Sequence, residues 1–205
     1  MTHQQTPEPA PPPGPARPGG GTGRYTAPVD VHLLLRRTGA HGDEVLLSRR
    51  AGPVYATGLL HLPSGHVDGP HEDMVDAVIR EGLEETGVRI DRADVRAAVT
   101  VHHRSPGGGA RVGFFLEAVR WRGTPSIREP HLCSELTWAP LAALPDDMVA
   151  FCRAGLDAYR RGVPMAAHFQ HPGDPIAHSP GADRLRPVPP ARRYGSPPGP
   201  AGPAA

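Results

Sequence analysis

The sequence predicts an α/β fold in a single domain, and three observations lead to this prediction. Short apolar runs typical of strands alternate with helical patterns in the middle of the chain. One helical pattern is long and amphipathic, with apolar residues on one side and carboxylates on the other. Both ends are rich in Pro, Gly and Ala, so the 205 residues hold one core of modest size.

The composition divides the chain into three segments. Of the 27 prolines, 8 fall in residues 1–28 and 10 in residues 172–205, and neither end shows apolar periodicity. Such segments bury too little apolar surface to offset the entropy of ordering. We therefore expect disordered tails at residues 1–28 and 171–205 and a folded domain at residues 29–170.

The expected elements follow one another in a mixed order. Runs of apolar residues bounded by turn residues predict the strands, and the 3.6-residue period predicts the helices. Gly-rich segments at residues 39–42 and 105–110 are expected to join neighbouring strands. Strands are expected at residues 29–36, 44–49, 59–62, 95–103, 111–121 and 134–138, and helices at residues 72–86 and 146–162.

The helix expected at residues 72–86 carries the strongest chemical signal. Glu81, Glu84 and Glu85 stand three and four residues apart, so they share one helical face. Like charges at this spacing cost ~0.2–0.5 kcal/mol per pair on an exposed helix, and a divalent cation would reverse that sign. Clustered carboxylates suit Mg²⁺ or Mn²⁺. The alternative is a solvated acidic face above a buried stripe.

Both ends of this helix also carry expected signals. Pro70 and the acidic residues Glu72 and Asp73 mark its start, where negative charge meets the helix dipole favourably. Gly87 followed by Val88 predicts a left-handed C-terminal cap with an apolar residue after it.

The segment at residues 65–88 resembles the signature of the Nudix hydrolases. That signature runs Gly, five residues, Glu, seven residues, then Arg-Glu-apolar-any-Glu-Glu-any-Gly-apolar. Two positions depart from it: six residues separate Gly65 from Glu72, and Gly82 stands where a larger apolar residue is usual. A glycine is tolerable there where the helix packs closely on a sheet. The matching residues are Glu72, Arg80, Glu81, Glu84, Glu85, Gly87 and Val88.

This resemblance implies a Nudix-like α/β/α sandwich with a mixed sheet. It also implies a metal-dependent hydrolase that cleaves the diphosphate bond of a nucleoside diphosphate linked to another group, with Mg²⁺ or Mn²⁺ as cofactor. Glu81, Glu84 and Glu85 would then hold the metal, and a backbone carbonyl at Ser64 or Gly65 would supply a further ligand.

The resemblance also suggests roles for the neighbouring residues. Glu81 would either ligate metal or accept a proton from the attacking water. Arg80 would orient the carboxylates through a bidentate contact, the alternative being an ordinary surface ion pair. Glu72 would brace the helix and its loop, and Gly87 would have a structural role.

A further catalytic carboxylate is expected from the loop after the strand at residues 111–121. Glu129 precedes Pro130, and residues 129–133 resemble a Glu-Pro-any-Lys-Cys segment of some nucleotide-cleaving Nudix enzymes, with Leu132 in place of Lys. A solvated loop position is the alternative for Glu129. Glu117 is a second candidate, although it lies within a strand pattern.

Two residues are candidates for substrate binding. His66 follows Gly65 at the mouth of the expected site, where it could contact phosphate or serve only the loop. Tyr55 could stack on a base or simply pack on the protein. The expected substrate is a nucleoside triphosphate, including non-standard ones. The alternatives are ADP-ribose or a nucleotide sugar, and a nucleotide-sensing module without turnover.

Charge and hydropathy bound the remaining partners. The formal net charge of +1 gives no general attraction to nucleic acid polymers or anionic membranes. The sequence has no long apolar run and no signal-peptide pattern, so we expect a cytoplasmic protein with Cys133 and Cys152 reduced. The partner expected is therefore a small-molecule nucleotide, and a homodimer stays open.

Overall fold

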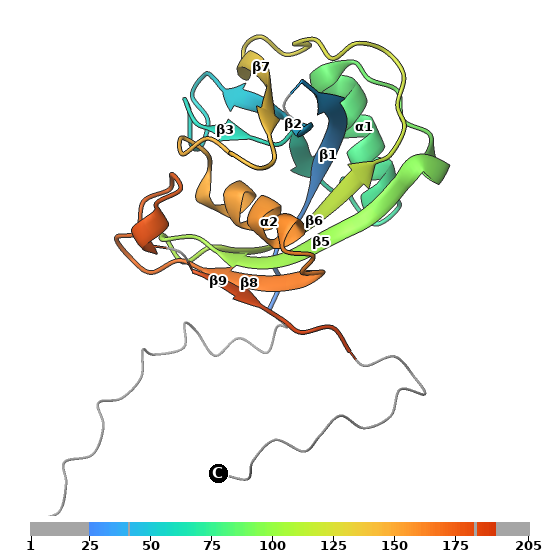
Figure 1. Cartoon of the computed structure of the whole chain (residues 1–205). Helices are drawn as coiled ribbons and strands as arrows, with labels where there is room; N and C mark the ends of the chain where they lie inside the picture. The colour runs from blue at the N-terminus through green and yellow to red at the C-terminus, as the bar shows by residue number, and fades with distance from the viewer. Residues whose placement is uncertain (1–24, 41, 183, 192–205) are drawn as a thin grey trace, which may run out of the picture.

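The computed structural model describes residues 25–40, 42–182 and 184–191 (Figure 1). The expected tail residues 1–24 and 192–205 lie outside this range. The elements in chain order are β1 (Val29–Gly39), β2 (Gly42–Arg50), β3 (Leu60–His61), β4 (Ser64–His66), α1 (Met74–Thr86), the 3₁₀ turn η1 (Arg92–Asp94), β5 (Val95–Arg104), β6 (Ala110–Ala118), β7 (Cys133–Pro140), α2 (Ala150–Arg160), β8 (Met165–Phe169), the 3₁₀ turn η2 (Pro180–Ala182) and β9 (Leu185–Pro187).

The described strands form one mixed sheet. Its order is β3-β2-β1-β6-β5-β8-β9, with β4 paired to β1 and β7 paired to β2. The β1–β6 and β5–β8 pairs are parallel, and the other pairs are antiparallel. The mixed sheet expected from the family resemblance is confirmed.

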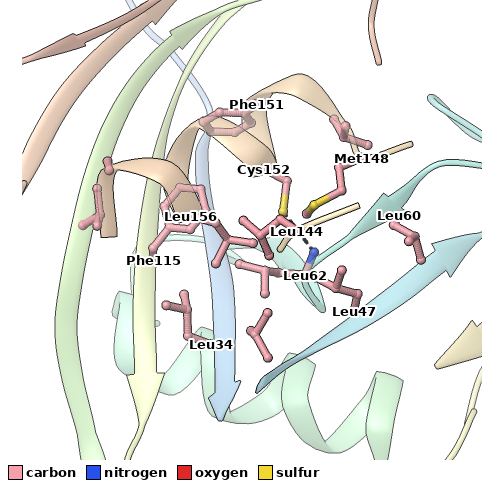
Figure 2. Packing of buried hydrophobic residues seen from close by; sticks show 14 of the residues in the cluster. Leu34, Leu47, Leu60, Leu62, Phe115, Leu144, Met148, Phe151, Cys152 and Leu156 are labelled. Carbon is pink, nitrogen blue, oxygen red and sulfur yellow. Dashed lines mark hydrogen bonds between the residues drawn. The ribbon is translucent and has the colours of Figure 1, made fainter. Parts of the chain in front are cut away.

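The two helices cover opposite faces of this sheet (Figure 1). Successive side chains of a strand point to opposite faces, and β1 shows this directly. Val31, Leu33 and Leu35 pack with residues of α1, whereas Leu34 packs with residues of α2. Figure 2 shows Leu34 in the buried cluster beneath α2, together with α2 residues such as Leu156. The expected α/β/α sandwich is therefore the observed architecture.

Local signals define both ends of α1. The helix begins at Met74, two residues later than expected, because Asp73 and not Glu72 caps it. The Asp73 side chain accepts hydrogen bonds from the backbone N–H groups of Val75 and Asp76. At the other end Gly87 adopts the left-handed conformation, with φ 74°, and its N–H donates to the Leu83 carbonyl.

Close packing explains the glycine within α1. Gly82 is buried, and a Cβ atom at this position would lie 3.0 Å from Leu33 Cδ2 and 3.3 Å from Ile90 Cδ1. The helix backbone therefore packs closely on the sheet at β1, which is the condition under which a glycine is tolerable at this position of the signature.

The C-terminal part of the chain departs from the expected domain boundary. We expected a disordered tail from residue 171, but the described residues beyond it contain η2 and β9, and β9 pairs with β8. Neither β8 nor β9 was expected. The segment is Pro-rich, yet backbone hydrogen bonds to the rest of the fold order it, together with the ion pair between Asp174 and Arg184 within the segment. No helix among the described residues is long and apolar enough to cross a membrane.

Candidate active site

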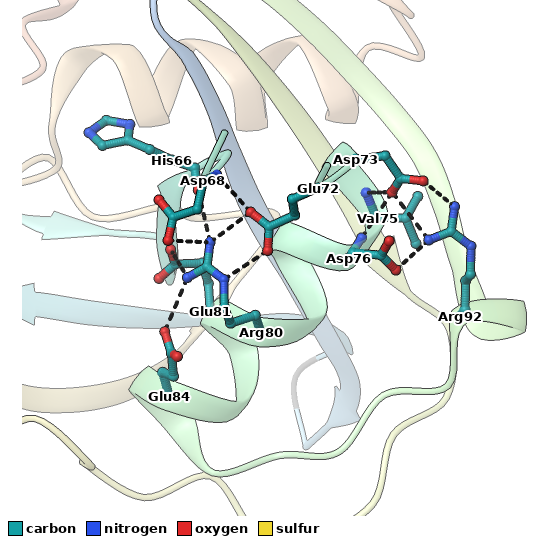
Figure 3. A network of polar contacts seen from close by, with 10 residues as sticks. All are labelled: His66, Asp68, Glu72, Asp73, Val75, Asp76, Arg80, Glu81, Glu84 and Arg92. Atoms are coloured by element: carbon teal, nitrogen blue, oxygen red, sulfur yellow. Dashed lines mark hydrogen bonds and ion pairs between the residues drawn. The ribbon is translucent and has the colours of Figure 1, made fainter. Parts of the chain in front are cut away.

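Arg80 lies at the centre of a carboxylate cluster on α1 (Figure 3). Its Nε and Nη2 atoms donate to the two oxygens of Glu72 at 2.8 and 3.1 Å. Its Nη1 atom donates to Glu81 Oε1 at 2.7 Å and to Glu84 Oε2 at 3.1 Å. The hydrogen bonds with Glu72 raise the pKa of Arg80, so the guanidinium is a permanent charge that fixes the carboxylates around it.

Glu72 ties the preceding loop to the helix. Besides the Arg80 contacts, Glu72 Oε2 accepts a hydrogen bond from the Asp68 N–H at 2.7 Å, and Arg80 Nη2 donates to the His66 carbonyl at 3.0 Å. The Arg80 hydrogen bonds, followed by that from Asp68, lower the pKa of Glu72. These hydrogen bonds fix the loop at residues 66–71, which is one residue longer than in the signature.

Gly65 permits the closest approach between this loop and α1. It lies on β4, which pairs with β1, and a Cβ atom at this position would overlap the Glu81 carboxylate. The signature glycine is therefore required by packing against Glu81. Burial raises the pKa of Glu81, although the hydrogen bond from Arg80 opposes this effect.

Glu85 is the carboxylate with the most strongly altered pKa in the cluster. Burial raises its pKa to about 8, and the nearby charges of Glu81 and Glu129 act in the same direction. The Ser64 N–H, which donates to Glu85 Oε2 at 3.1 Å, and the Arg50 guanidinium oppose the shift. A carboxylate held in such surroundings is a common mark of a functional site.

Glu81 and Glu85 border a cavity of about 310 Å³, here called the acidic cavity. Glu129 reaches it from the loop before β7, where its backbone carbonyl accepts hydrogen bonds from the N–H groups of Leu132 and Cys133, both at 2.9 Å. The residues that matter at its border are Glu81, Glu85, Glu129, Ser64, Gly65 and Arg50.

A second cavity of about 290 Å³, here called the aromatic cavity, adjoins the first. Both cavities are bordered by Arg50, His61, Ser64, Gly65 and His66. The aromatic cavity is further bordered by Asp30, His32, Tyr55, Arg111, Phe151 and neighbouring residues of α2. The Asp30 carboxylate accepts hydrogen bonds from His66 Nδ1 at 2.7 Å and Arg111 Nη1 at 3.0 Å.

Sequence reasoning missed the basic residues of the site. Arg50 ends β2, and its Nε donates to the Tyr55 carbonyl at 2.6 Å, so the guanidinium is fixed between the two cavities. An arginine at the end of a buried strand, just before Gly52, was a signal that could have indicated it. Arg111 and Asp30 carried no comparable signal, because they meet only through the β1–β6 pairing.

The expected site residues do not all meet in one place. Glu81, Glu85, Glu129, Ser64, Gly65 and His66 border the acidic cavity, and Tyr55 borders the aromatic one. The Glu84 side chain is 53% exposed and points to Arg80. Glu117, the second candidate for the loop carboxylate, instead pairs with Arg36 and Tyr159.

The donor set suits a hard divalent cation. Within the described residues no group of three His, Cys, Asp or Glu side chains is arranged as a metal site. Mg²⁺, however, usually takes one or two protein carboxylates and completes its octahedron with water and substrate phosphates. Glu81 and Glu85 provide two carboxylates beside one cavity, which Ser64 and Gly65 of β4 also border.

Comparison with known proteins agrees with this geometry. The MutT NUDIX hydrolase from Burkholderia pseudomallei is 28% identical, with a TM-score of 0.57, and the match covers 65% of this chain and 98% of that one. The MutT protein from Methanosarcina mazei Go1 is 22% identical, with a TM-score of 0.55 and coverages of 66% and 94%. A NUDIX hydrolase from Nitrosomonas europaea is 19% identical, with a TM-score of 0.52 and coverages of 67% and 90%.

The two less identical structures support the fold alone. No curated protein matches the sequence. The family model of the NUDIX domain matches residues 26–158, which is more than half of the chain and includes the whole carboxylate cluster of α1. The protein therefore belongs to the NUDIX family and is a Nudix-type pyrophosphohydrolase, acting on phosphoric anhydride bonds.

Proposed function

We propose that this pyrophosphohydrolase is metal-dependent and cleaves the diphosphate bond of nucleoside triphosphates. One observation carries the proposal: Glu81, Glu85 and Glu129 border one cavity with Arg50, and the aromatic cavity opens beside it. Carboxylates for a cation, an arginine for phosphate and aromatic side chains for a base therefore lie next to one another.

Glu81 and Glu85 are the proposed metal ligands, with a backbone carbonyl of Ser64 or Gly65 as a third. Glu84 is the proposed outer member of the set, since Arg80 Nη1 bridges it to Glu81. Mg²⁺ or Mn²⁺, when bound, would neutralise phosphate charge and lower the pKa of the attacking water. Burial raises the pKa of Glu85, and a cation beside this carboxylate would stabilise its ionised form.

The remaining residues have separate proposed roles in positioning, proton transfer and substrate binding. Arg80 holds the carboxylates in place. Glu129 is the proposed acceptor of the proton from the attacking water, the role that Glu81 would take otherwise. The Arg50 guanidinium, fixed by the Tyr55 carbonyl, is placed to contact the phosphates between the two cavities. His66, whose Nδ1 bonds to Asp30, borders both cavities.

The preference for nucleoside triphosphates rests on the Glu129 segment, whose resemblance to nucleotide-cleaving enzymes is supported by its position at the acidic cavity. A hydrolysis screen with Mg²⁺ or Mn²⁺ over nucleoside triphosphates, ADP-ribose and nucleotide sugars tests this choice. The highest kcat/KM is expected for a nucleoside triphosphate. A parent protein that releases no product from any triphosphate would refute it.

The role of Glu129 is tested with one variant and a matched control. Glu129→Gln should lower kcat about tenfold or more and change KM little, since a proton acceptor acts mainly in the transition state. Glu135→Gln, an exposed glutamate of β7 that pairs with Arg49, should retain parental constants. Constants for Glu129→Gln within a few-fold of the parent would reduce Glu129 to a solvated loop residue.

A further inference from the structure

The wall of the aromatic cavity that faces the core is formed by the start of α2. Val149, Phe151 and Cys152 border the cavity. Phe151 stacks on the His103 ring, with centroids 4.3 Å apart and an interplanar angle of 9°, and meets the His32 ring edge-on at 5.1 Å. A small displacement of the first turn of α2 would therefore change the shape of the cavity.

No side chain caps this turn. The N-cap residue is Val149, which has no oxygen to accept a backbone hydrogen bond. Backbone groups from residues 176–178 take over this task. The Ala150 N–H donates to the Ile176 carbonyl at 2.9 Å, and the His178 N–H donates to the Met148 carbonyl at 2.7 Å. The segment therefore forms an antiparallel bridge along the entry to α2.

The entry to α2 is held from its other side by β3. The Leu60 N–H donates to the Asp147 carbonyl, and the Val149 N–H donates to the Leu60 carbonyl, both at 2.9 Å. Figure 2 shows Leu60 and Met148 on the same side of the buried cluster as Cys152, whose sulfur accepts the Leu62 N–H at 3.1 Å. Residues 176–178 bond to the entry of α2 through Ala150 and Met148, separately from these β3 contacts.

These residues belong to what we call the strap, residues 171–182 and 184–191. The strap lies beyond the region matched by the family model, which ends at residue 158. Asp174 accepts two hydrogen bonds from Arg184, at 3.0 and 3.1 Å, and one from the His171 N–H at 2.8 Å. Together with the β8–β9 pairing, these contacts fold the strap back over the start of α2.

We propose that the strap fixes the shape of the aromatic cavity and thereby sets the affinity for the nucleobase of the substrate. The aromatic rings of Tyr55, Phe151 and His32 are chemically suited to a planar heteroaromatic group. His32 adds a second argument. Its buried ring borders the cavity, and neither of its nitrogens has a hydrogen-bond partner among the described residues.

This inference rests on the proposed function, because it needs a substrate with a base. It assigns a positioning role to the strap, which touches neither the metal ligands nor the acidic cavity. The strap should therefore act on KM and leave kcat nearly unchanged.

Arg184→Gln tests the proposal, with Arg186→Gln as its matched control. The first removes the bidentate pair with Asp174, whereas Arg186 is exposed on β9. Truncation after Gln170, compared with truncation after Ala191, provides a second and stronger disruption. Thermal melting first shows that each variant is folded. The rate of amide hydrogen exchange at Ala150 then shows whether the hydrogen bond to the Ile176 carbonyl is kept. Steady-state kinetics on the best nucleoside triphosphate give KM and kcat.

For Arg184→Gln we expect faster exchange at Ala150 and a KM raised about tenfold, with kcat within about threefold of the parent. Faster exchange with an unchanged KM would overturn the proposal, and so would a loss in kcat as large as the rise in KM. An unchanged exchange rate at Ala150 in both Arg184→Gln and the truncation after Gln170 would show that the strap does not cap α2. If the parent hydrolyses only ADP-ribose or a nucleotide sugar, the proposed substrate is wrong, and the strap is judged by the same KM comparison on that substrate.

Discussion

Helices α1 and α2 lie on opposite faces of one sheet, and their N-termini are closed in different ways. The Asp73 side chain, adjacent in sequence, caps α1. Backbone groups of residues 176–178, more than 20 residues further along the chain, close α2. Helix α1 is therefore specified by its own sequence, whereas the position of α2 depends on the strap.

The two faces also differ in charge. The α1 face carries Arg80 among carboxylates, with the pKa of Glu85 raised by burial. The α2 face carries buried histidines instead, and burial lowers the pKa of His32 to about 4 and that of His103 to about 3, so both rings are neutral. A charged face and a neutral aromatic face thus meet at adjoining cavities, which suits a ligand with a phosphate end and a base end.

The largest expected effect lies on the charged face. Glu85→Gln should lower kcat/KM by at least about 100-fold, because residues that only support metal ligands already cost ~10–100-fold when changed. Glu84→Gln should cost less, since its side chain is 53% exposed and outside the acidic cavity. Hydrolysis assays at saturating Mg²⁺ measure both. Equal losses in the two variants would mean that the exposed Glu84 matters as much as the half-buried Glu85.

The charged face was predictable from the sequence for a physical reason. Glu81, Glu84 and Glu85 are related by helical spacing alone, and Gly65, Glu72 and Arg80, which precede them in the same short segment, follow from the resemblance to the Nudix signature. Their chemistry is therefore visible before any tertiary contact is known. Even there, the expectation gave Glu84 and Glu85 the same role, and the structure separates them: Glu85 borders the acidic cavity, whereas Glu84 is 53% exposed.

The neutral face depends on contacts between distant segments. Asp30 meets Arg111 through the β1–β6 pairing, and Phe151 meets His32 and His103 across the core. Composition also misled at the C-terminal end, where a Pro-rich segment proved to contain β9. Hydrogen bonds to the fold order that segment, and they leave no periodic pattern in its sequence.

A second prediction uses the neutral histidines. The folded-state pKa of His103 lies near 3, below its usual value of 6.5, so between these pH values the unfolded chain binds a proton that the folded protein does not. The contribution of His103 to the free energy of unfolding should therefore be largest above pH 6.5 and fall as the pH drops, by up to ~1.4 kcal/mol per pH unit, whereas the raised pKa of Glu85 contributes a slope of opposite sign. Urea unfolding at pH 7, 6 and 5 measures the slope.

In His103→Phe the free energy of unfolding should fall less steeply between pH 7 and 5 than in the parent, because phenylalanine can stack on Phe151 without a titrating group. His71→Phe, at an exposed position before α1, should leave the slope as in the parent. Parallel slopes for His103→Phe and the parent would show that His103 does not contribute to the acid sensitivity.

The smallest expected effect concerns the cap of α1. Asp73→Ala removes both cap hydrogen bonds and the ion pair with Arg92, and it should lower the melting temperature by ~2–4 °C. Asp76→Ala removes only an Arg92 ion pair and should cost less than half as much, since exposed ion pairs contribute little. Calorimetry at pH 7 compares the two.

Asp73→Ala also shows whether loosening the N-terminus of α1 affects kcat and KM as loosening that of α2 is expected to do. Glu85 lies at the far end of α1, so fraying at Asp73 should leave both kcat and KM close to parental values. Loosening the strap at α2, by contrast, should change KM because Phe151 lies in the first turn. A rise in KM for Asp73→Ala as large as that for Arg184→Gln would mean that any loss of stability loosens the site. If Asp73→Ala keeps the parental kcat and KM, the N-terminal contacts of α2 affect substrate binding, whereas those of α1 do not.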